Sequence, residues 1–322
     1  MSNEILKVSH LVKHFPAKRT KIIGGKKFVR AVDDISFNIN VGESLGLVGE
    51  SGCGKTTTGR LITRLIEPTS GTVEFLDEDI TKISKREMRR LRKDIQIIFQ
   101  DPYASLNPRH TVGTIIGTAM EINGINPNQG VKHRTKELLE IVGLNPEHIN
   151  RYPHEFSGGQ RQRIGIARAI SVNPKLIIAD EPVSALDVSI QAQIINLLKD
   201  LQRDFGLAFL FIAHDLAVVR HFTQRVAVMY LGKIVEISDR NTLYSNPRHP
   251  YTKALLSAIP QVGNSSSRTQ QIKLSGDIPN VMDPPSGCRF RTRCWKAENS
   301  CAETEPLLQR QGSNSVACHF PE

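Results

Sequence analysis

The chain has 322 residues, of which 39% are hydrophobic and 23% charged, and its formal net charge is +10. This length allows one large α/β domain with a smaller appendage, and the composition is that of an ordinary globular protein. No stretch approaches the ~18 consecutive apolar residues needed to span a bilayer, and the first residues lack the features of a signal peptide. We therefore expect a protein of the cytosol or of the cytosolic face of a membrane. A basic surface can bind nucleic acid or an anionic membrane surface, and the net charge alone does not distinguish between these two partners.

The N-terminal part alternates apolar and polar residues and carries many β-branched side chains. This pattern predicts antiparallel strands within 5–15 and 28–47, with an exposed hairpin tip at 22–27 between them. Further along, the sequence predicts a strand at 71–76, a basic helix at 84–93 and a short buried strand at 95–99.

The central part changes to helical periodicity over 110–170. Two apolar runs follow, at 176–179 and 207–213, and a helical segment at 188–203 separates them. Buried strands that alternate with helices predict a parallel sheet covered on both faces, and hence an α/β fold. The polar stretch 261–271 is linker-like. We therefore expect one domain over 1–260, with a helical subdomain at about 105–170, and a small C-terminal extension over 261–322.

Residues 49–56, Gly-Glu-Ser-Gly-Cys-Gly-Lys-Thr, form a complete GxxxxGK[ST] phosphate-binding loop. An apolar run at 44–48 precedes the loop and a helix-competent run at 57–66 follows it. Glycines let the backbone N–H groups approach phosphates, and the helix N-terminus adds partial positive charge. Lys55 is expected to reach the β- and γ-phosphates, and the Thr56 hydroxyl to bind Mg²⁺. The chain is therefore predicted to bind a nucleoside triphosphate, and a chance glycine-rich turn is the alternative.

Polar residues at the ends of predicted strands complete this site. Asp180 and Glu181 follow one apolar run, so Asp180 is expected to hold Mg²⁺ and Glu181 to polarise a water molecule. Gln100 ends another strand, and its amide can reach Mg²⁺ and the attacking water. His214 ends a third strand and is expected to sense the γ-phosphate. A structural histidine and a surface glutamine are the alternatives for the last two residues.

Ser157-Gly158-Gly159-Gln160 begins a predicted helix and forms a second candidate anion site. Such a turn is also a common loop, so the signal is informative mainly through its position about 20 residues before the acidic pair. Two phosphate sites with one nucleotide per chain suggest a head-to-tail dimer, in which each chain covers the nucleotide of the other.

The order of these motifs resembles the ATP-binding-cassette (ABC) ATPases over roughly residues 5–260. The resemblance implies a RecA-like parallel core with an antiparallel β subdomain and a helical subdomain. By this resemblance, four motifs of the family are assigned: Gln100 is the Q-loop glutamine, residues 156–160 are the signature motif, residues 184–187 are the D-loop and His214 is the switch histidine. Phe156 replaces the usual signature leucine and Thr56 the commoner serine, and neither change removes a needed functional group.

The resemblance also implies site residues. Glu181, His214 and Gln100 are the expected catalytic residues, and Thr56, Gln100 and Asp180 the expected Mg²⁺ ligands. An aromatic residue that stacks on adenine is expected before the phosphate loop, and Phe15 fits best, with Phe28 as the competitor. The remaining expected contacts to ATP are Gly49, Ser51, Gly52, Cys53, Gly54, Lys55, Thr56, Thr57, Ser157, Gly158, Gly159, Gln160 and Asp187.

Three stretches indicate a particular subgroup of the ABC ATPases. They are residues 99–109, residues 249–256 and the basic insertion near 17–29. They resemble the second ATPase subunit of bacterial and archaeal dipeptide/oligopeptide importers. This resemblance implies a peripheral ATPase on the cytoplasmic face of the membrane that drives peptide import. Its implied partners are a homologous ATPase in a heterodimer, two transmembrane permease subunits and, indirectly, an extracytoplasmic peptide-binding protein, with no nucleic acid. Nickel or another small solute is the alternative cargo, and a soluble ABC ATPase acting on nucleic acid or ribosomes is the alternative class.

Four of the five cysteines lie in the C-terminal extension. Cys53, in the phosphate loop, is expected to be structural. Cys288, Cys294, Cys301 and Cys318 are spaced more widely than the usual zinc-ligand pairs, and disulfides are rare in the cytosol. Four thiolates suit an iron–sulfur cluster, and some of the resembling ATPases carry a four-iron cluster in this tail. We expect a [4Fe–4S] cluster, with zinc or no metal as alternatives. His319 could replace one of the ligands, but a solvated histidine near the terminus is the preferred interpretation.

Overall fold

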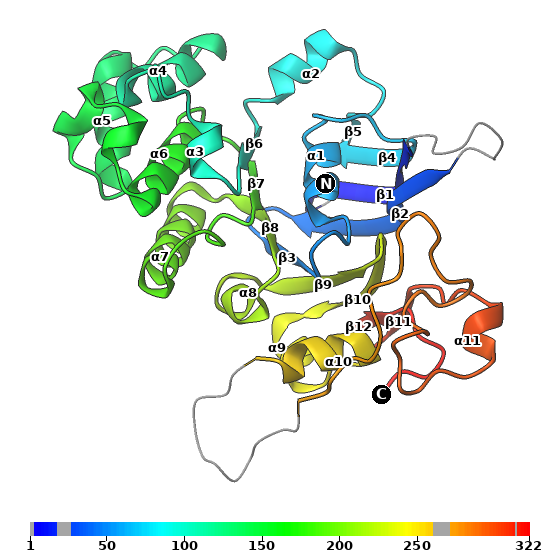
Figure 1. The fold of residues 1–322 in the computed structure, drawn as a ribbon. Helices are drawn as coiled ribbons and strands as arrows, with labels where there is room; N and C mark the ends of the chain where they lie inside the picture. Colours follow the sequence, from blue (N-terminus) through cyan, green and yellow to red (C-terminus); the bar gives the residue numbers. More distant parts are fainter. Residues whose placement is uncertain (1–2, 18–26, 260–270, 313) are drawn as a thin grey trace. The chain divides into compact units, whose positions relative to one another are not determined.

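The computed structural model describes residues 3–17, 27–259, 271–312 and 314–322. These residues form two compact units (Figure 1). The first unit contains the described parts of 1–5, 39–43 and 82–212, and the second contains those of 6–38, 44–81 and 213–322. The predicted hairpin tip at 22–27 and the predicted linker at 261–271 lie almost entirely outside the described residues.

The first unit is built on parallel strands in the order β6-β7-β8, which are Ile95–Ile98, Leu176–Asp180 and Ala208–Ala213. Ile95 pairs with Leu176, and Leu176 pairs with Ala208 on the next strand. Every residue of β7 and β8 is buried, as expected for strands that are covered on both faces. The predicted parallel pairing of the apolar runs is confirmed.

The helices of the first unit are α2 (Lys85–Leu91), α3 (Pro102–Ser105), α4 (Val112–Ile122), α5 (Val131–Ile141), α6 (Gly158–Ile170) and α7 (Val188–Phe205), together with the 3₁₀ turns η1 (Pro146–Asn150) and η2 (Pro153–Glu155). α4, α5 and α6 pack against one another in the helical cluster of Figure 1. Pro146 and Pro153 each begin a 3₁₀ turn, where the missing N–H of proline has no cost. The predicted helical region therefore consists of several short helices, and these two turns lie between α5 and α6.

The second unit contains two groups of strands. One is a four-stranded sheet in the order β2-β1-β4-β5, which are Phe28–Asn40, Glu4–Pro16, Ser70–Phe75 and Glu78–Asp79. The other has the order β3-β9-β10-β12-β11, which are Ser44–Val48, Arg225–Tyr230, Lys233–Asp239, Asn314–Val316 and Gln309–Gln311. β3 pairs with β9 in parallel, whereas β12 pairs with β10 antiparallel. The C-terminal extension thus supplies two strands to this unit.

The helices of the second unit are α1 (Lys55–Ile62), α8 (Leu216–Phe222), α9 (Arg240–Ser245), α10 (Pro250–Ser257) and α11 (Ser300–Glu303). The predicted strand region 28–47 is divided into β2 and β3 by a turn at Gly42, whose φ of 70° favours glycine. β9 to β12 were not among the predicted strands. In the described part of the chain, no helix has the length and apolarity needed to cross a membrane.

Candidate functional site

The phosphate loop of the second unit runs from β3 into α1, which confirms the predicted strand–loop–helix order. A Cβ atom on Gly54 would lie 2.0 Å from the carbonyl oxygen of Ala31, and one on Gly49 would lie 2.1 Å from that of Met229. The loop packs so tightly on its surroundings that only glycine fits at these two positions. Glycine is therefore needed at positions 49 and 54 for two reasons: it lets the backbone approach the phosphates, and it fits the close packing of the loop.

Lys55 is buried at the centre of this loop. Its Nζ donates to the carbonyl oxygens of Gly49 at 2.8 Å and Glu50 at 3.0 Å. The ammonium group is thus held inside the loop that is predicted to receive phosphate. Cys53 is also buried, and burial raises the pKa of its thiol, so the thiol is neutral near pH 7. This agrees with the structural role expected for Cys53.

Glu50 connects the phosphate loop to the C-terminal part of the second unit. Its carboxylate accepts two hydrogen bonds from Arg293, at 2.8 and 3.1 Å, in the bidentate geometry that suits guanidinium. Its backbone N–H donates to the Tyr251 hydroxyl at 3.0 Å. Tyr251 packs in turn on Tyr230 and Phe290, with ring centroids 4.7 and 5.3 Å away. This connection was not predicted from the sequence, because Glu50 occupies a variable position of the motif and Arg293 lies 243 residues away.

Glu236, on β10, anchors the start of α10. Its carboxylate is buried and accepts the backbone N–H groups of Arg248 at 2.8 Å and His249 at 3.0 Å. Burial raises the pKa of the Glu236 carboxyl above its usual value of 4.5. The α10 helix that this carboxylate holds carries Tyr251, so Glu236 supports the phosphate loop indirectly.

The raised pKa of Glu236 predicts a pH dependence of stability. The folded chain binds this proton more tightly than the unfolded chain, so Glu236 destabilises the fold progressively as pH rises from 4.5 through the folded pKa. A Glu236→Gln variant should lack this dependence, but its amide can accept only one of the two N–H groups, which costs about 1–3 kcal/mol. Chemical denaturation between pH 5 and 8 should show that the deficit of the variant relative to wild type shrinks as pH rises. The exposed Glu303→Gln variant is the control, and a constant deficit would contradict the prediction.

In the first unit, Asp180 is the last residue of β7 and Glu181 directly follows it. Asp180 is buried, and Glu181 has a left-handed backbone with φ 46° whose N–H donates to the carbonyl oxygen of Ile212 at 2.9 Å. The side-chain amide of Gln100 donates to the Glu181 carboxylate at 3.1 Å. The fold thus brings together two residues that the sequence analysis selected separately, 81 positions apart.

Ser157 begins α6 with a reciprocal capping box. Its Oγ accepts the backbone N–H of Gln160 at 3.3 Å, and the Gln160 side chain accepts the backbone N–H of Ser157 at 3.0 Å. A Cβ atom on Gly159 would lie 2.6 Å from Cγ2 of Ile190, so a larger residue there would displace the Ile190 side chain of α7. The predicted second anion site therefore also has a local structural role.

The capping box predicts how two serine variants differ. Ser157→Ala and Ser84→Ala each remove a capping box, since Ser84 caps α2 in the same way, and each should lower the free energy of unfolding by about 1 kcal/mol. Only Ser157→Ala should also lower ATPase activity, because Ser157 is the serine predicted to contact phosphate. Denaturation and steady-state ATPase assays on both variants measure the two effects. Equal loss of activity in both would assign Ser157 a capping role alone.

Comparison with known proteins places these features in one family. Residues 32–184 match the family described as ABC transporter, and 235–301 match the oligopeptide/dipeptide transporter, C-terminal region. The oligopeptide transport ATP-binding protein AppF of Bacillus subtilis is 50% identical over 319 residues, which cover 98% of this chain and 97% of AppF. The chain belongs to the ABC transporter family. It is an ATPase of that family.

Solved structures of ABC ATPases agree with this assignment. The ATP-binding cassette MJ0796 bound to ADP and phosphate is 28% identical, with a TM-score of 0.65, and the match covers 73% of this chain and 98% of that one. The cbiO1 protein from Clostridium perfringens is 27% identical, also with a TM-score of 0.65, over 76% of this chain and 92% of its own. The ABC fold expected from the order of motifs is confirmed.

Other predicted site residues of this ABC ATPase lie at or near the ends of helices and strands. Thr56 and Thr57 are in the first turn of α1, Asp187 directly precedes α7, and His214 directly follows β8. Phe15 lies on β1, half-buried, with Nζ of Lys13 5.0 Å from its ring centroid. Phe28 begins β2 and is 40% exposed. The choice between Phe15 and Phe28 as the adenine-stacking residue stays a prediction.

The four cysteines of the tail converge on one small cavity, which we call the cysteine cavity; its lining includes Cys288, Cys294, Cys301 and Cys318. Burial raises the pKa of Cys288 to about 11 and also raises the pKa values of Cys294 and Cys318. The donor set has the number and chemistry of iron–sulfur ligands. However, no group of three or more described His, Cys, Asp or Glu side chains is arranged to hold a metal ion. The Nε2–H group of His319 donates to the carbonyl oxygen of Thr304 at 3.0 Å.

Proposed function

We propose that this ABC ATPase drives the import of dipeptides or oligopeptides through a membrane transporter. The observation that carries the proposal is the match of residues 235–301 to the C-terminal region of oligopeptide/dipeptide transporters. The name of AppF supports it, because AppF matches this chain over almost its whole length. The same match favours peptides over nickel, other small solutes, nucleic acid or ribosomes.

In the proposed mechanism, the backbone amides of the phosphate loop and Lys55 bind the phosphates of ATP. Thr56, Gln100 and Asp180 offer hydroxyl, amide and carboxylate oxygens, which are the ligands that Mg²⁺ prefers. When bound, Mg²⁺ would neutralise charge on the β- and γ-phosphates. Glu181 polarises the attacking water. The hydrogen bond from Gln100 to Glu181 supports this role, because it orients a carboxylate that must accept a proton.

Two ATPase subunits close over two nucleotides in this proposal. Ser157 to Gln160 of one subunit contact the γ-phosphate bound by the other, and His214 senses it. ATP therefore favours the closed state, and hydrolysis restores the open state. Exposed Tyr103, on α3 just after Gln100, supports docking of a permease subunit at this segment. The partner ATPase is a homologue, the two permease subunits span the membrane, and this chain is peripheral on the cytoplasmic face. An extracytoplasmic peptide-binding protein delivers the cargo.

Uptake measurements test the proposed function. A deletion strain is complemented with wild type, Lys55→Ala or the exposed-lysine control Lys199→Ala, and uptake of labelled di- and oligopeptides is measured. Wild type and Lys199→Ala should restore uptake, whereas Lys55→Ala should not, because it removes the lysine of the phosphate loop. Unchanged peptide uptake in the deletion strain would contradict peptide import, and parallel uptake of labelled nickel would then test the alternative cargo.

We further propose that Cys288, Cys294, Cys301 and Cys318 bind a [4Fe–4S] cluster. Their convergence on one cavity supports the proposal. Protein purified without oxygen should contain about four iron and four sulfide ions per chain, and Cys301→Ser should lose them while Cys53→Ser retains them. One zinc ion per chain, or no metal, would contradict the proposal.

A further inference from the structure

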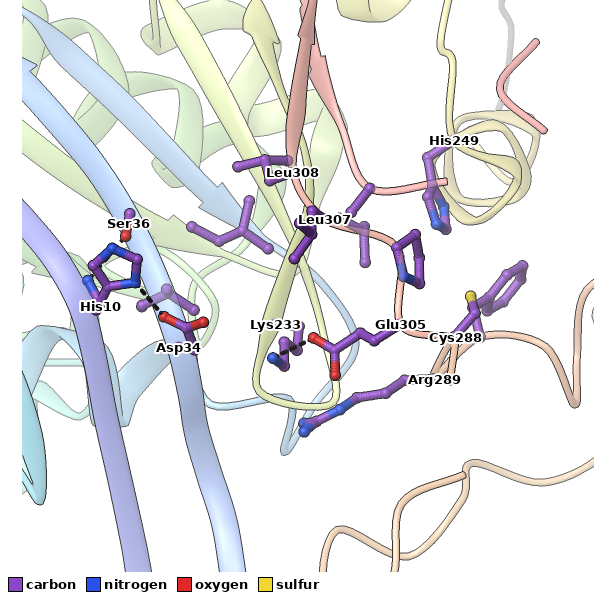
Figure 2. Close-up of a pocket in the computed structure, with 16 residues that line it drawn as sticks. His10, Asp34, Ser36, Lys233, His249, Cys288, Arg289, Glu305, Leu307 and Leu308 are labelled. Atoms are coloured by element: carbon purple, nitrogen blue, oxygen red, sulfur yellow. Dashed lines mark hydrogen bonds and ion pairs between the residues drawn. The ribbon is translucent and has the colours of Figure 1, made fainter. Parts of the chain in front are cut away.

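A second and much larger cavity lies entirely within the second unit. Its volume is about 340 Å³, within the range of small-molecule sites. At about 30 Å³ per water molecule, it has room for about ten, which suits a compact molecule of dipeptide size. We call it the tail cavity, since the C-terminal extension forms one side of it (Figure 2); its lining includes Asp34, Lys233, His249, Arg289, Glu305 and Leu307.

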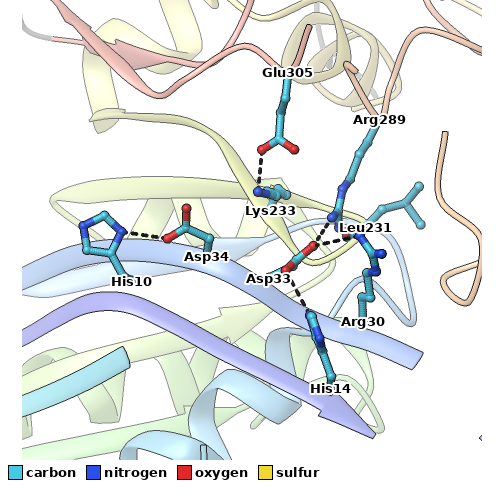
Figure 3. A network of polar contacts seen from close by, with 9 residues as sticks. All are labelled: His10, His14, Arg30, Asp33, Asp34, Leu231, Lys233, Arg289 and Glu305. Atoms are coloured by element: carbon cyan, nitrogen blue, oxygen red, sulfur yellow. Dashed lines mark hydrogen bonds and ion pairs between the residues drawn. The ribbon is translucent and has the colours of Figure 1, made fainter. Parts of the chain in front are cut away.

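The polar lining of the tail cavity carries charges of both signs. Lys233 is paired with Glu305, and the His10 ring with Asp34 at 2.8 Å (Figure 3). Both pairs are partly open to solvent, with Glu305 44% and Asp34 51% exposed, so they contribute little to stability and can turn toward a ligand. Arg289 differs, because it is buried and held by Asp33 and by the carbonyl oxygen of Leu231. A ligand with charges of both signs can pair with a basic and an acidic side chain here, whereas a ligand with a single charge can pair with only one kind.

His249 supplies an independent sign of a missing partner. Its Nδ1 accepts the backbone N–H of Tyr251 at 3.0 Å, so the ring proton is on Nε2. Burial lowers the pKa of His249 to about 3, and the ring is therefore neutral. Nε2 is buried and has no hydrogen-bond partner among the described residues, although its ring borders both the tail cavity and the cysteine cavity. A buried N–H donor without an acceptor is energetically unfavourable.

The rest of the lining is apolar. Ile234, Val235 and Phe290 are buried in its wall, and Leu308 lies beside Leu307, which is 69% exposed. A large apolar side chain as exposed as Leu307 gains stability when a ligand covers it. The tail cavity thus combines an apolar wall with charged side chains of both signs, and a buried N–H donor without an acceptor lies in its lining residue His249.

We propose that the tail cavity binds a short zwitterionic peptide with an apolar side chain, typified by a dipeptide. Lys233 receives the carboxylate, Asp34 and Glu305 receive the ammonium group, and the leucines cover the side chain. The choice of a peptide over another zwitterion rests on the proposed function, in which peptides are the transported product. Such a site would let the ATPase detect imported peptide.

Calorimetry on the full chain tests this site with the dipeptide alanyl-leucine as the probe. Wild type should bind about one dipeptide per chain in a saturable manner. N-acetyl-alanyl-leucine and alanyl-leucine amide, which each lack one charge, should bind at least about tenfold more weakly. Equal binding of the blocked peptides, or no saturable heat up to ~10 mM dipeptide, would overturn the proposal. This arm needs no variant, so it does not depend on the folding of one.

Variants locate the binding. Lys233→Met and Leu307→Asn should each weaken dipeptide binding at least about tenfold. Lys7→Met removes an ion-paired lysine and Leu65→Asn an exposed leucine, both outside the tail cavity, and they should bind as wild type does. Wild-type affinity in both cavity variants would overturn the proposal. Peptide uptake without dipeptide binding would refute this site alone, whereas binding by a chain whose deletion leaves uptake unchanged would refute the proposed function alone.

Discussion

Replacing Glu181 by glutamine is expected to lower kcat for ATP hydrolysis by about 10²–10⁴-fold, the usual contribution of a general base. The amide of glutamine cannot accept the proton of the attacking water. It can still accept the hydrogen bond that Gln100 donates at 3.1 Å, so the local structure should persist. ATP should consequently bind Glu181→Gln about as well as it binds wild type, and the loss should be confined to kcat.

Steady-state kinetics and nucleotide-binding measurements on the same preparation separate the two effects. Glu140→Gln, which changes an exposed glutamate on α5, is the matched control and should keep wild-type kcat. Hydrolysis by Glu181→Gln at the wild-type rate would show that another group activates the water. A parallel loss of ATP affinity would instead show that Glu181 supports the structure of the nucleotide site.

The features that could be predicted from the sequence each lie within one short stretch of chain, and the structure confirms the secondary structure predicted for them. The phosphate loop could be predicted because its chemistry and its strand–loop–helix context lie within about 20 consecutive residues. β7 and β8 could be predicted because continuous apolar runs are typical of buried parallel strands. In each case the signal and the structure occupy the same stretch of chain.

Features that depend on distant residues could not be predicted. β12, at Asn314–Val316, has only three residues, and its place beside β10 is set by pairing with residues near 236. A strand that short has no periodicity to detect. The contact of Arg293 with Glu50 likewise joins a variable position of the phosphate loop to the tail, and neither residue signals its partner in sequence. The convergence of four cysteines was suggested by their number, but their spacing could not define how they are arranged.

Removal of the Arg293 guanidinium, in Arg293→Met, is expected to lower the free energy of unfolding by about 2–3 kcal/mol. Arg293 is 8% exposed and Glu50 23% exposed, so the variant leaves a carboxylate that is mostly buried without its bidentate partner. Partial exposure of Glu50 keeps the loss below that of a fully buried pair. ATP affinity should fall as well, because the backbone of Glu50 accepts a hydrogen bond from Lys55 and donates one to the Tyr251 hydroxyl on α10.

A double-mutant cycle separates this ion pair from other effects of the substitution. Glu50→Gln in the Arg293→Met background should cost little more than Arg293→Met alone, because the unpaired charge disappears with the second change. Arg203→Met removes an exposed arginine that also makes ion pairs, with Asp200 and Asp204, and should leave both stability and ATP affinity close to wild type. Additive losses in the cycle would mean that the two side chains act independently. A strong coupling would instead show that the C-terminal tail stabilises the phosphate loop through a single ion pair, and that changes in the tail can therefore reach the nucleotide.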